Sequence, residues 1–217
     1  AGISKIKCAT ITELEMAAAA GVPDILLAYQ PSGPKIARFA SVIKKFPAIT
    51  FGCLVDNIES ARGIGAVMDK EGLSVKVWLD LNVGMNRTGI SPGKEALELF
   101  KSLNVIKGIR AYGLHAYDGH LRDQDLQTRS MKCDAAFQPV AQLALEIESA
   151  TGQKPVICAG GTPTFPIHAR RKAVECSPGT FIYWDTGYGD LLKEQPYLHA
   201  ALVMTRVLSK PAPDLLC

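Results

Sequence analysis

Short apolar runs and amphipathic helical patterns alternate along the chain. Runs rich in β-branched and other apolar residues, such as 24–29 (DILLAY) and 49–55 (ITFGCLV), are typical of strands. The segments between them, such as 35–45 and 58–68, repeat apolar residues every three or four positions and so predict helices. Strands and helices that alternate with short connections indicate parallel βα units.

Polar residues beside these patterns predict where the helices begin. Thr10 and Glu13 form a predicted capping box, in which each side chain bonds the backbone N–H of the other residue. Asp56 is predicted to cap the helix that follows the strand at 49–55. Ser91 is predicted to cap a helix over 92–103.

Several predicted strands lack polar alternation, which is expected when helices or side chains cover both faces of a sheet. Right-handed crossovers permit a doubly wound sheet or a barrel. Polar or glycine residues follow almost every strand, which favours the barrel. We predict an α/β fold, a (β/α)8 TIM-type barrel over residues 1–192 that lacks its first βα unit. The apolar segment 198–208 (LHAALVMTRVL) is predicted as the first strand of a C-terminal β domain, of which residues 193–217 are the truncated start.

Composition excludes several classes of protein. The net charge of +3 and the scattered basic residues predict no nucleic-acid surface. No apolar run is long enough to cross a bilayer and no signal peptide opens the chain, so we expect a cytoplasmic protein without a membrane partner. No CxxC pair occurs, and buried thiols explain the cysteines better than disulfides or zinc. The cysteines are Cys8, Cys53, Cys133, Cys158, Cys176 and Cys217.

The stretch 75–90 (VKVWLDLNVGMNRTGI) changes from a buried strand to a polar loop within a few residues. Ligands of α/β proteins bind at the carboxyl ends of parallel strands. Arg87 therefore lies where a fixed positive charge meets an anionic or phenolic oxygen of a ligand. A surface arginine that pairs with an acidic neighbour explains the residue equally well.

Two glycine loops follow consecutive strands near the end of the pattern. Glycines in Gly160-Gly161-Thr162 let backbone N–H groups approach a phosphate, and Thr162 adds a hydroxyl. Ser177-Pro178-Gly179-Thr180 offers a second such loop. Loops after the last two strands of a barrel commonly bind phosphate. Tight turns remain the alternative for both loops.

His115 and Tyr117 lie at the end of the strand at 109–117. Alternation places them on one side, facing the barrel interior, where either serves as acid or base or stacks on a ring. A hydrogen-bonded core histidine is the alternative for His115. Asp118 is nearby, but no HxH or HExxH spacing supports a metal site, so none is predicted within the chain. His168 and His199 are assigned no role.

Five segments together resemble one family, the D-threonine aldolase and D-serine dehydratase group, whose barrel is shared with alanine racemase. These are fold-type-III pyridoxal-phosphate enzymes. The resemblance covers nearly the whole chain. The segments, in order, are GISKIKCATITELE, WLDLNVGMNRTGI, GLHAYDGH, ICAGGTPTF and VECSPGTFIYWD.

The resemblance implies a pyridoxal-phosphate site at the mouth of the barrel. Arg87 matches the arginine beside the phenolic oxygen of the cofactor, and His115 or Tyr117 would lie near its ring. Ser177 falls where alanine racemase has an arginine that faces the pyridine nitrogen. This neutral residue argues against a plain alanine racemase. The phosphate-binding loops of the family match Gly161, Thr162, Gly179 and Thr180.

Two functional parts of the family are expected outside this chain. The Schiff-base lysine belongs to the first barrel strand of the family, in a motif like His-x-Lys-Thr-His-Lys that does not occur here. Lys5 and Lys7 match the second strand and are not assigned that role. The metal ligands belong to the C-terminal β domain, so a divalent metal is expected only in the parent enzyme. We expect an internal portion of a longer enzyme, inactive alone.

The function implied is that of a pyridoxal-phosphate-dependent lyase of the D-threonine aldolase type. The parent would cleave a β-hydroxy-D-amino acid to glycine and an aldehyde, with a metal at the β-hydroxyl. The resemblance also implies a homodimer. D-serine dehydratase and amino-acid racemase chemistry on the same barrel are alternatives. A non-catalytic pyridoxal-phosphate-binding protein and an unrelated barrel enzyme that acts on a sugar phosphate are two further ones.

Overall fold

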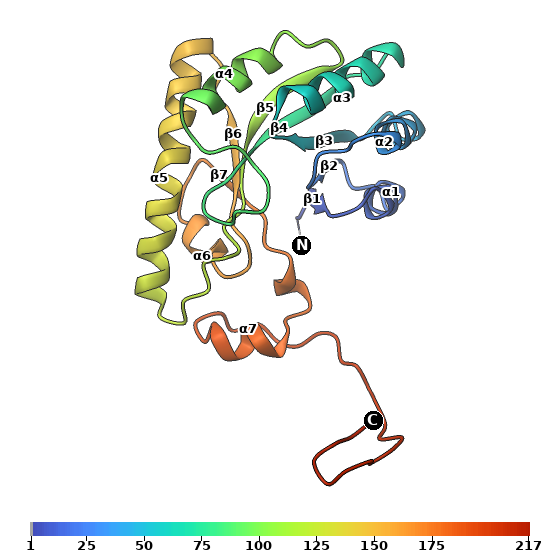
Figure 1. The fold of residues 1–217 in the computed structure, drawn as a ribbon, viewed down its shortest axis with the longest axis vertical. Helices are drawn as coiled ribbons and strands as arrows, with labels where there is room; N and C mark the ends of the chain where they lie inside the picture. Colours follow the sequence, from blue (N-terminus) through green and yellow to red (C-terminus); the bar gives the residue numbers. More distant parts are fainter. Residues whose placement is uncertain (1) are drawn as a thin grey trace. The chain divides into compact units, whose positions relative to one another are not determined.

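The computed structural model describes residues 2–217, which divide into two compact units, 2–178 and 179–217. The first unit contains a sheet of seven parallel strands that neighbour one another in sequence order. The sheet curls into a half-barrel with its helices on the outer side, which confirms the predicted fold class (Figure 1). The strands are β1 (Lys5–Cys8), β2 (Asp24–Leu27), β3 (Thr50–Val55), β4 (Val75–Leu81), β5 (Ile109–Ala116), β6 (Val156–Ala159) and β7 (Val174–Cys176).

Six α-helices connect or follow these strands in the first unit. The long helix α5 contains Pro139 and continues past it. The helices are α1 (Ile11–Ala19), α2 (Pro34–Lys45), α3 (Ile58–Lys70), α4 (Lys94–Leu103), α5 (Leu126–Thr151) and α6 (Phe165–His168). Within the described residues, no helix is both long and apolar enough to span a membrane.

Alternate residues of the strands face two different environments. Leu27, Leu79 and Leu114 belong to the main core, which lies between the sheet and the helices. Leu54 and Trp78 belong to a smaller apolar cluster formed by residues of the opposite strand faces. Both faces of the sheet are therefore partly apolar, which is why the strands read as continuous apolar runs. The predicted alternation in β5 is confirmed, because Leu114 packs in the main core and His115 does not.

The helix caps agree with the sequence only in part. Thr10 Oγ1 accepts the backbone N–H of Glu13 at 3.1 Å, which confirms the capping box. The prediction for Asp56 is wrong, because Asn57 caps α3 instead. The Asp56 carboxylate accepts the backbone N–H of Gly89 at 3.0 Å, a contact made across the fold. The prediction for Ser91 is also wrong, since α4 begins only after Gly93.

The second unit contains a 3-10 helix, η1 (Thr180–Ile182), and helix α7 (Thr186–Leu191). The strand predicted at 198–208 is wrong, because these residues have no regular secondary structure. A strand needs a partner for its backbone groups, and within the described residues no strand of this unit supplies one. Leu202 and Val203 are about nine-tenths exposed. The assignment of residues 193–217 to a β domain stays a prediction.

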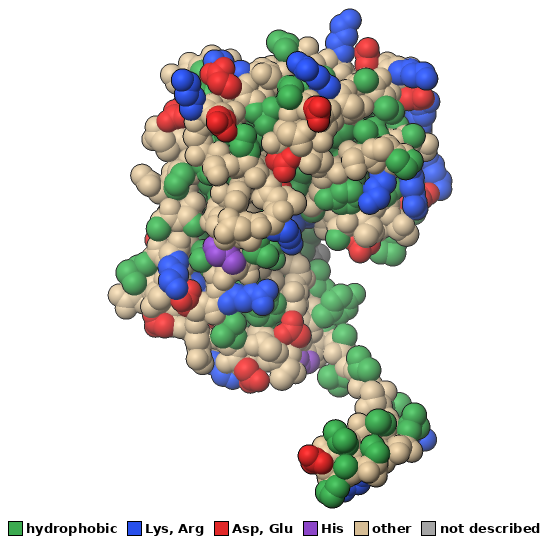
Figure 2. All heavy atoms as spheres, in the orientation of Figure 1, with side chains coloured by type: hydrophobic (Ala, Val, Ile, Leu, Met, Phe, Trp, Pro, Cys, Tyr) green, Lys and Arg blue, Asp and Glu red, His purple; other side chains and the backbone are tan. Residues whose placement is uncertain are grey.

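All six cysteines are free thiols. Four of them lie in β1, β3, β6 and β7, and three of those four are buried. On the face shown in Figure 2, acidic and basic side chains are interspersed over the first unit. That face therefore carries no field of one sign, in keeping with the modest net charge.

Candidate active site

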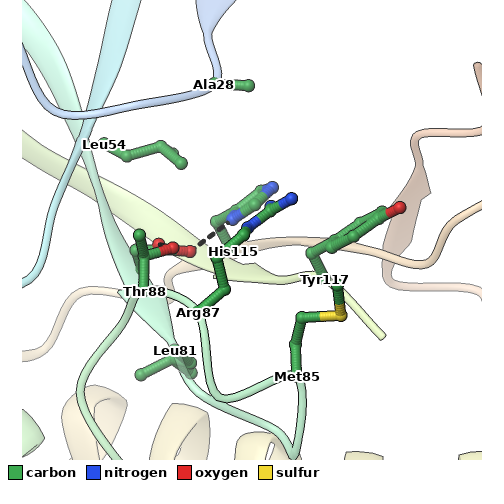
Figure 3. A pocket seen from close by; sticks show the side chains of 9 residues that line it. Ala28, Leu54, Leu81, Met85, Arg87, Thr88, His115 and Tyr117 are labelled. Atoms are coloured by element: carbon green, nitrogen blue, oxygen red, sulfur yellow. Dashed lines mark hydrogen bonds and ion pairs between the residues drawn. The ribbon is translucent and has the colours of Figure 1, made fainter. Parts of the chain in front are cut away.

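A small pocket lies where β2 to β5 end, at the carboxyl edge of the sheet (Figure 3). In this view the side chains of Arg87, His115 and Tyr117 project to the same side of the strand ends. The pocket is lined by Ala28, Leu54, Asp80, Leu81, Met85, Arg87, Thr88, His115 and Tyr117. This edge is where ligands bind in α/β barrels.

A buried carboxylate decides which ring nitrogen of His115 carries the proton. His115 Nδ1 lies 2.6 Å from Asp80 Oδ1, and Thr88 Oγ1 donates to Asp80 Oδ2 at 2.8 Å. Burial lowers the pKa of His115 below its usual value, although the hydrogen bond to Asp80 opposes this shift. A neutral His115 then donates from Nδ1 to Asp80 and leaves Nε2 as an acceptor.

Lys7 from β1 joins this histidine to the end of β7. Its Nζ lies 3.3 Å from His115 Nε2 and 2.7 Å from Ser177 Oγ. Ser177 in turn donates to the carbonyl oxygen of Gly160 at 3.0 Å. Removal from solvent lowers the pKa of the Lys7 amine. Sequence reasoning assigned Lys7 no role, although lysines at positions 5 and 7 of one strand share a face.

The loop that carries Arg87 is held by side chains at both ends. Asn82 Oδ1 accepts the backbone N–H groups of Gly84 and Asn86 at 3.1 and 3.0 Å. Gly89 has a φ of 98°, and a Cβ atom there would meet the backbone N of Asn82 at 2.6 Å. Only glycine fits at this position, so the turn after β4 depends on it.

Arg87 does not pair with an acidic neighbour among the described residues. Its guanidinium carbon instead lies 5.2 Å from the centroid of the Tyr117 ring. The side chain is exposed at the pocket. Of the two alternatives drawn from the sequence, the ion-paired surface arginine does not describe this arrangement.

A second buried network organises the loop after β6. Asp118 Oδ1 accepts from Thr164 Oγ1 at 2.6 Å and from the backbone N–H of Gly161 at 3.2 Å. Asp118 Oδ2 lies 2.8 Å from His168 Nε2. Burial alone would raise the pKa of Asp118, but the hydrogen bonds outweigh it and hold the pKa below its usual value. His168, which the sequence left without a role, therefore anchors this loop.

Asp118, Cys133 and His168 also present three metal-ligand types within 4.8 Å of one another. The contacts among them in this structure are hydrogen bonds. Arg171 Nη1 lies 3.0 Å from His168 Nδ1, and because a guanidinium only donates, Nε2 carries the proton toward Asp118. Burial raises the pKa of Cys133 to about 12, so its thiol stays protonated. The three side chains form a closed hydrogen-bond network.

The structure brings part of the predicted site together. Arg87, His115 and Tyr117 line one pocket, and Ser177 reaches His115 through Lys7. The other predicted residues are differently placed. Gly161 uses its N–H on Asp118, and a Cβ there would meet the Tyr117 ring at 3.0 Å. Thr162 is buried in the same loop, while Gly179 and Thr180 belong to the second unit. Their roles stay predictions.

A half-barrel of parallel strands whose polar side chains gather at the carboxyl edge defines an α/β barrel protein with a pocket at that edge. Residues 1–187 match the sequence profile of the alanine racemase N-terminal domain. The chain therefore belongs to the alanine racemase N-terminal domain family, which confirms the resemblance drawn from its motifs.

Three relatives with assigned activities show the range within this family. The chain is 24% identical to a 3-hydroxy-D-aspartate aldolase of Paracoccus denitrificans, over 96% of its own length and 56% of the relative. It is 26% identical to a D-threonine aldolase of Arthrobacter sp, over 98% and 57%. It is 25% identical to a D-threo-3-hydroxyaspartate dehydratase of Delftia sp., over 85% and 49%. The chain thus spans about half the length of these curated relatives.

Solved structures agree on the fold. The crystal structure of D-threonine aldolase from Filomicrobium marinum superposes with a TM-score of 0.88 at 24% identity, over 97% of this chain and 57% of that one. The D-threo-3-hydroxyaspartate dehydratase of Delftia sp. HT23 gives 0.74, over 88% and 50%.

Proposed function

We propose that this chain is the cofactor-binding barrel of a pyridoxal-phosphate-dependent lyase that cleaves a β-hydroxy-D-amino acid to glycine and an aldehyde. The observation that carries the proposal is the pocket where Arg87 and Tyr117 meet the hydrogen-bonded series Asp80, His115 and Lys7. The aldolases of Paracoccus and Arthrobacter support the lyase class.

The residues at the pocket fit a flat, anionic, heteroaromatic ligand. Arg87 offers a guanidinium with no carboxylate partner among the described residues. Tyr117 offers an aromatic face, and Lys7 and Ser177 offer polar groups from β1 and from the end of β7, the two edge strands of the sheet. When bound, pyridoxal phosphate supplies an electron sink for breaking a bond at the α-carbon of an amino acid.

Each residue would have a separate task. Arg87 would hold the phenolic oxygen of the cofactor through charge-assisted hydrogen bonds. His115, kept neutral by burial and oriented by Asp80, would accept a hydrogen bond from Lys7 at Nε2 and so hold that amine beside the pocket. Tyr117 would lie against the ring and exclude water from one side. Gly161 would let Tyr117 pack closely on the loop after β6.

Other parts of the proposal rest on the family resemblance and not on the contacts described above. Thr162, Gly179 and Thr180 are proposed as phosphate ligands on the resemblance alone. A divalent metal is proposed for the whole protein, with ligands outside this chain. One structure of the Delftia dehydratase is described as a metal-free form, which supports a metal in that relative. A homodimer is proposed on the same resemblance.

The test uses the protein at its full natural length with pyridoxal phosphate and a divalent metal. We expect D-threonine and 3-hydroxy-D-aspartate to yield glycine and the corresponding aldehyde. Ammonia and a 2-oxo acid would instead identify a dehydratase, and the L-enantiomer a racemase. Cofactor binding without any product would identify a non-catalytic carrier. Absence of cofactor binding, with sugar phosphates bound in its place, would overturn the proposal.

A further inference from the structure

The loop that carries Arg87, residues 82–90, is closed at its base by β4. The backbone N–H of Asn82 donates to the carbonyl oxygen of Ile90 at 2.9 Å, and the N–H of Ile90 donates to the carbonyl oxygen of Asp80 at 3.0 Å. These contacts come from the strand that precedes the loop. They close the Arg87 loop, but they do not fasten it to the loops of neighbouring strands.

Asp56, directly after β3, supplies the contact to a neighbouring strand. Its Oδ2 accepts the backbone N–H of Gly89 at 3.0 Å, two residues along the chain from Arg87. Among the described residues, the other hydrogen bonds of the Arg87 loop come from β4 or from the loop itself. The position of Arg87 relative to the ends of the other strands therefore depends on the Asp56 carboxylate.

The side chain of Gln30, in the loop after β2, orients this carboxylate. Gln30 Nε2 donates to Asp56 Oδ1 at 2.9 Å, and Gln30 Oε1 accepts the backbone N–H of Asp56 at 3.1 Å. Gln30, Asp56 and Gly89 thus join the loops after three adjacent strands, β2, β3 and β4, in series. Neither Gln30 nor Asp56 lines the pocket, so the series runs beside the site without entering it.

The Asp56 carboxylate is held by neutral donors. They are the N–H of Gly89 and the side-chain amides of Gln30 and Asn57, and no described residue forms an ion pair with Asp56. Burial alone would raise the pKa of Asp56, but these hydrogen bonds outweigh it and hold the pKa below its usual value. The ionised carboxylate is satisfied without a cation, and Arg87 stays directed at the pocket.

We propose that Asp56 positions Arg87 for the cofactor, because its hold on Gly89 keeps the guanidinium where the phenolic oxygen of pyridoxal phosphate would lie. The inference rests on the proposed function. Arginine has a long, flexible side chain, so the backbone beneath it sets where its charge can reach. A misplacement of about 1 Å is enough to impair a binding site. Asp56 and Gln30 are positioning residues, since neither touches the ligand.

The experiment compares two ligands on the protein at its full natural length. One is pyridoxamine 5′-phosphate, which cannot form an imine with a lysine, and the other is its 3-deoxy analogue, which lacks the phenolic oxygen. Calorimetry gives the dissociation constant of each. We expect Asp56→Ala to weaken binding of pyridoxamine 5′-phosphate about fivefold or more, the effect of losing a well-placed hydrogen bond. Binding of the 3-deoxy analogue should stay unchanged.

A double-mutant cycle tests whether Asp56 acts through Arg87. Arg87→Met alone should weaken binding of pyridoxamine 5′-phosphate, and adding Asp56→Ala to it should cause no further loss. A purely structural role of Asp56 would weaken both ligands and would do so in both backgrounds. Gln30→Met should give a smaller loss with the same ligand dependence, and it serves if Asp56→Ala fails to fold.

Asp125→Ala is the matched control. The Asp125 carboxylate also accepts a backbone N–H, that of Thr128 at 2.7 Å at the start of α5, and it has no hydrogen bond to the Arg87 loop. This variant should bind both ligands as the wild type does.

The outcomes separate the two proposals. A wild-type protein that binds neither ligand overturns the proposed function and, with it, the role of Asp56. Unchanged binding of pyridoxamine 5′-phosphate by Asp56→Ala and Gln30→Met overturns the role of Asp56 alone. A loss that is equal for both ligands, or that persists in the Arg87→Met background, overturns it as well.

Discussion

Two buried polar networks stand at the carboxyl edge of the same sheet and differ in how completely they are satisfied. The Asp118 carboxylate accepts hydrogen bonds from Thr164, Gly161 and His168, so both of its oxygens have partners within one network. Lys7 contacts His115 and Ser177 but has no carboxylate at hydrogen-bond distance among the described residues. A closed network stabilises a loop, whereas an open one costs stability until a ligand completes it. The comparison separates a network that stabilises a loop from one beside the pocket that we propose binds a ligand.

The largest effect is expected from breaking the closed network. Asp118→Ala removes the carboxylate that accepts from the buried hydroxyl of Thr164 and from the N–H groups of Gly161 and His168, and of these the Gly161 N–H keeps Thr164 Oγ1 as a second acceptor. The free energy of unfolding should fall by about 3 kcal/mol in urea denaturation, since several buried donors lose their partner. Asp134→Ala is the control, because Asp134 is exposed and its ion pair with Arg171 should contribute at most about 1 kcal/mol.

The ionised carboxylate of Asp118 should also make the free energy of unfolding fall at acid pH. The pKa of Asp118 is held below its unfolded value, which is about 3.9. Its contribution is therefore fully present above the unfolded pKa and is lost as the pH falls through the folded pKa. Denaturation curves of wild type and Asp118→Asn should converge below about pH 4. A difference that stays constant down to lower pH would contradict this role.

The next largest effect is expected on ligand binding at the pocket beside Lys7. Arg87→Met should weaken pyridoxal-phosphate binding about ten- to a hundredfold, because a charged hydrogen bond to the phenolic oxygen is lost. Stability should stay nearly unchanged, since the side chain is exposed. Arg110→Met is a matched control, because Arg110 lies 5.6 Å from the Tyr112 ring, near the start of β5. Equal binding by both variants would remove Arg87 from the site.

Replacing Lys7 is expected to have a smaller effect, and to raise the free energy of unfolding where replacing Asp118 lowers it. Without ligand, Lys7→Met should raise the free energy of unfolding by about 1 kcal/mol, as when a functional polar group is replaced in a partly buried site. The pKa of Lys7 is lower in the folded state than in the unfolded state, so the unfolded state binds the proton more tightly. The free energy of unfolding of the wild type therefore rises as the pH rises. The advantage of the variant should therefore shrink toward about pH 10 in melting curves. An advantage that grows with pH would be inconsistent with this environment.

The smallest effect is expected from metal. Zn²⁺ or a chelator should leave the melting temperature of this chain unchanged, since Asp118, Cys133 and His168 already form buried hydrogen bonds with one another. A rise in melting temperature with Zn²⁺ that Cys133→Ala abolishes would show that the network opens to a metal after all.

Local patterns predicted much of the scaffold. The capping box at Thr10 and the inward position of His115 follow from contacts within a few residues, where spacing alone decides the partner. Contacts from distant elements decided the rest. Asp56 is drawn to Gly89 and leaves the cap to Asn57, and no local pattern reports that contact. The apolar segment at 198–208 has strand-like composition, but composition does not supply a strand to pair with.

The sequence by itself determined the order of strands and helices, the face on which each side chain lies and the family, because periodicity and ordered motifs are local properties of the chain. Only the tertiary structure decided that Lys7 meets Ser177, 170 positions away, and that His168 meets Asp118. Hydrogen-bond partners across a curled sheet depend on strand curvature and loop path, which no short stretch of residues encodes. The protonation of these groups follows from that arrangement and from burial.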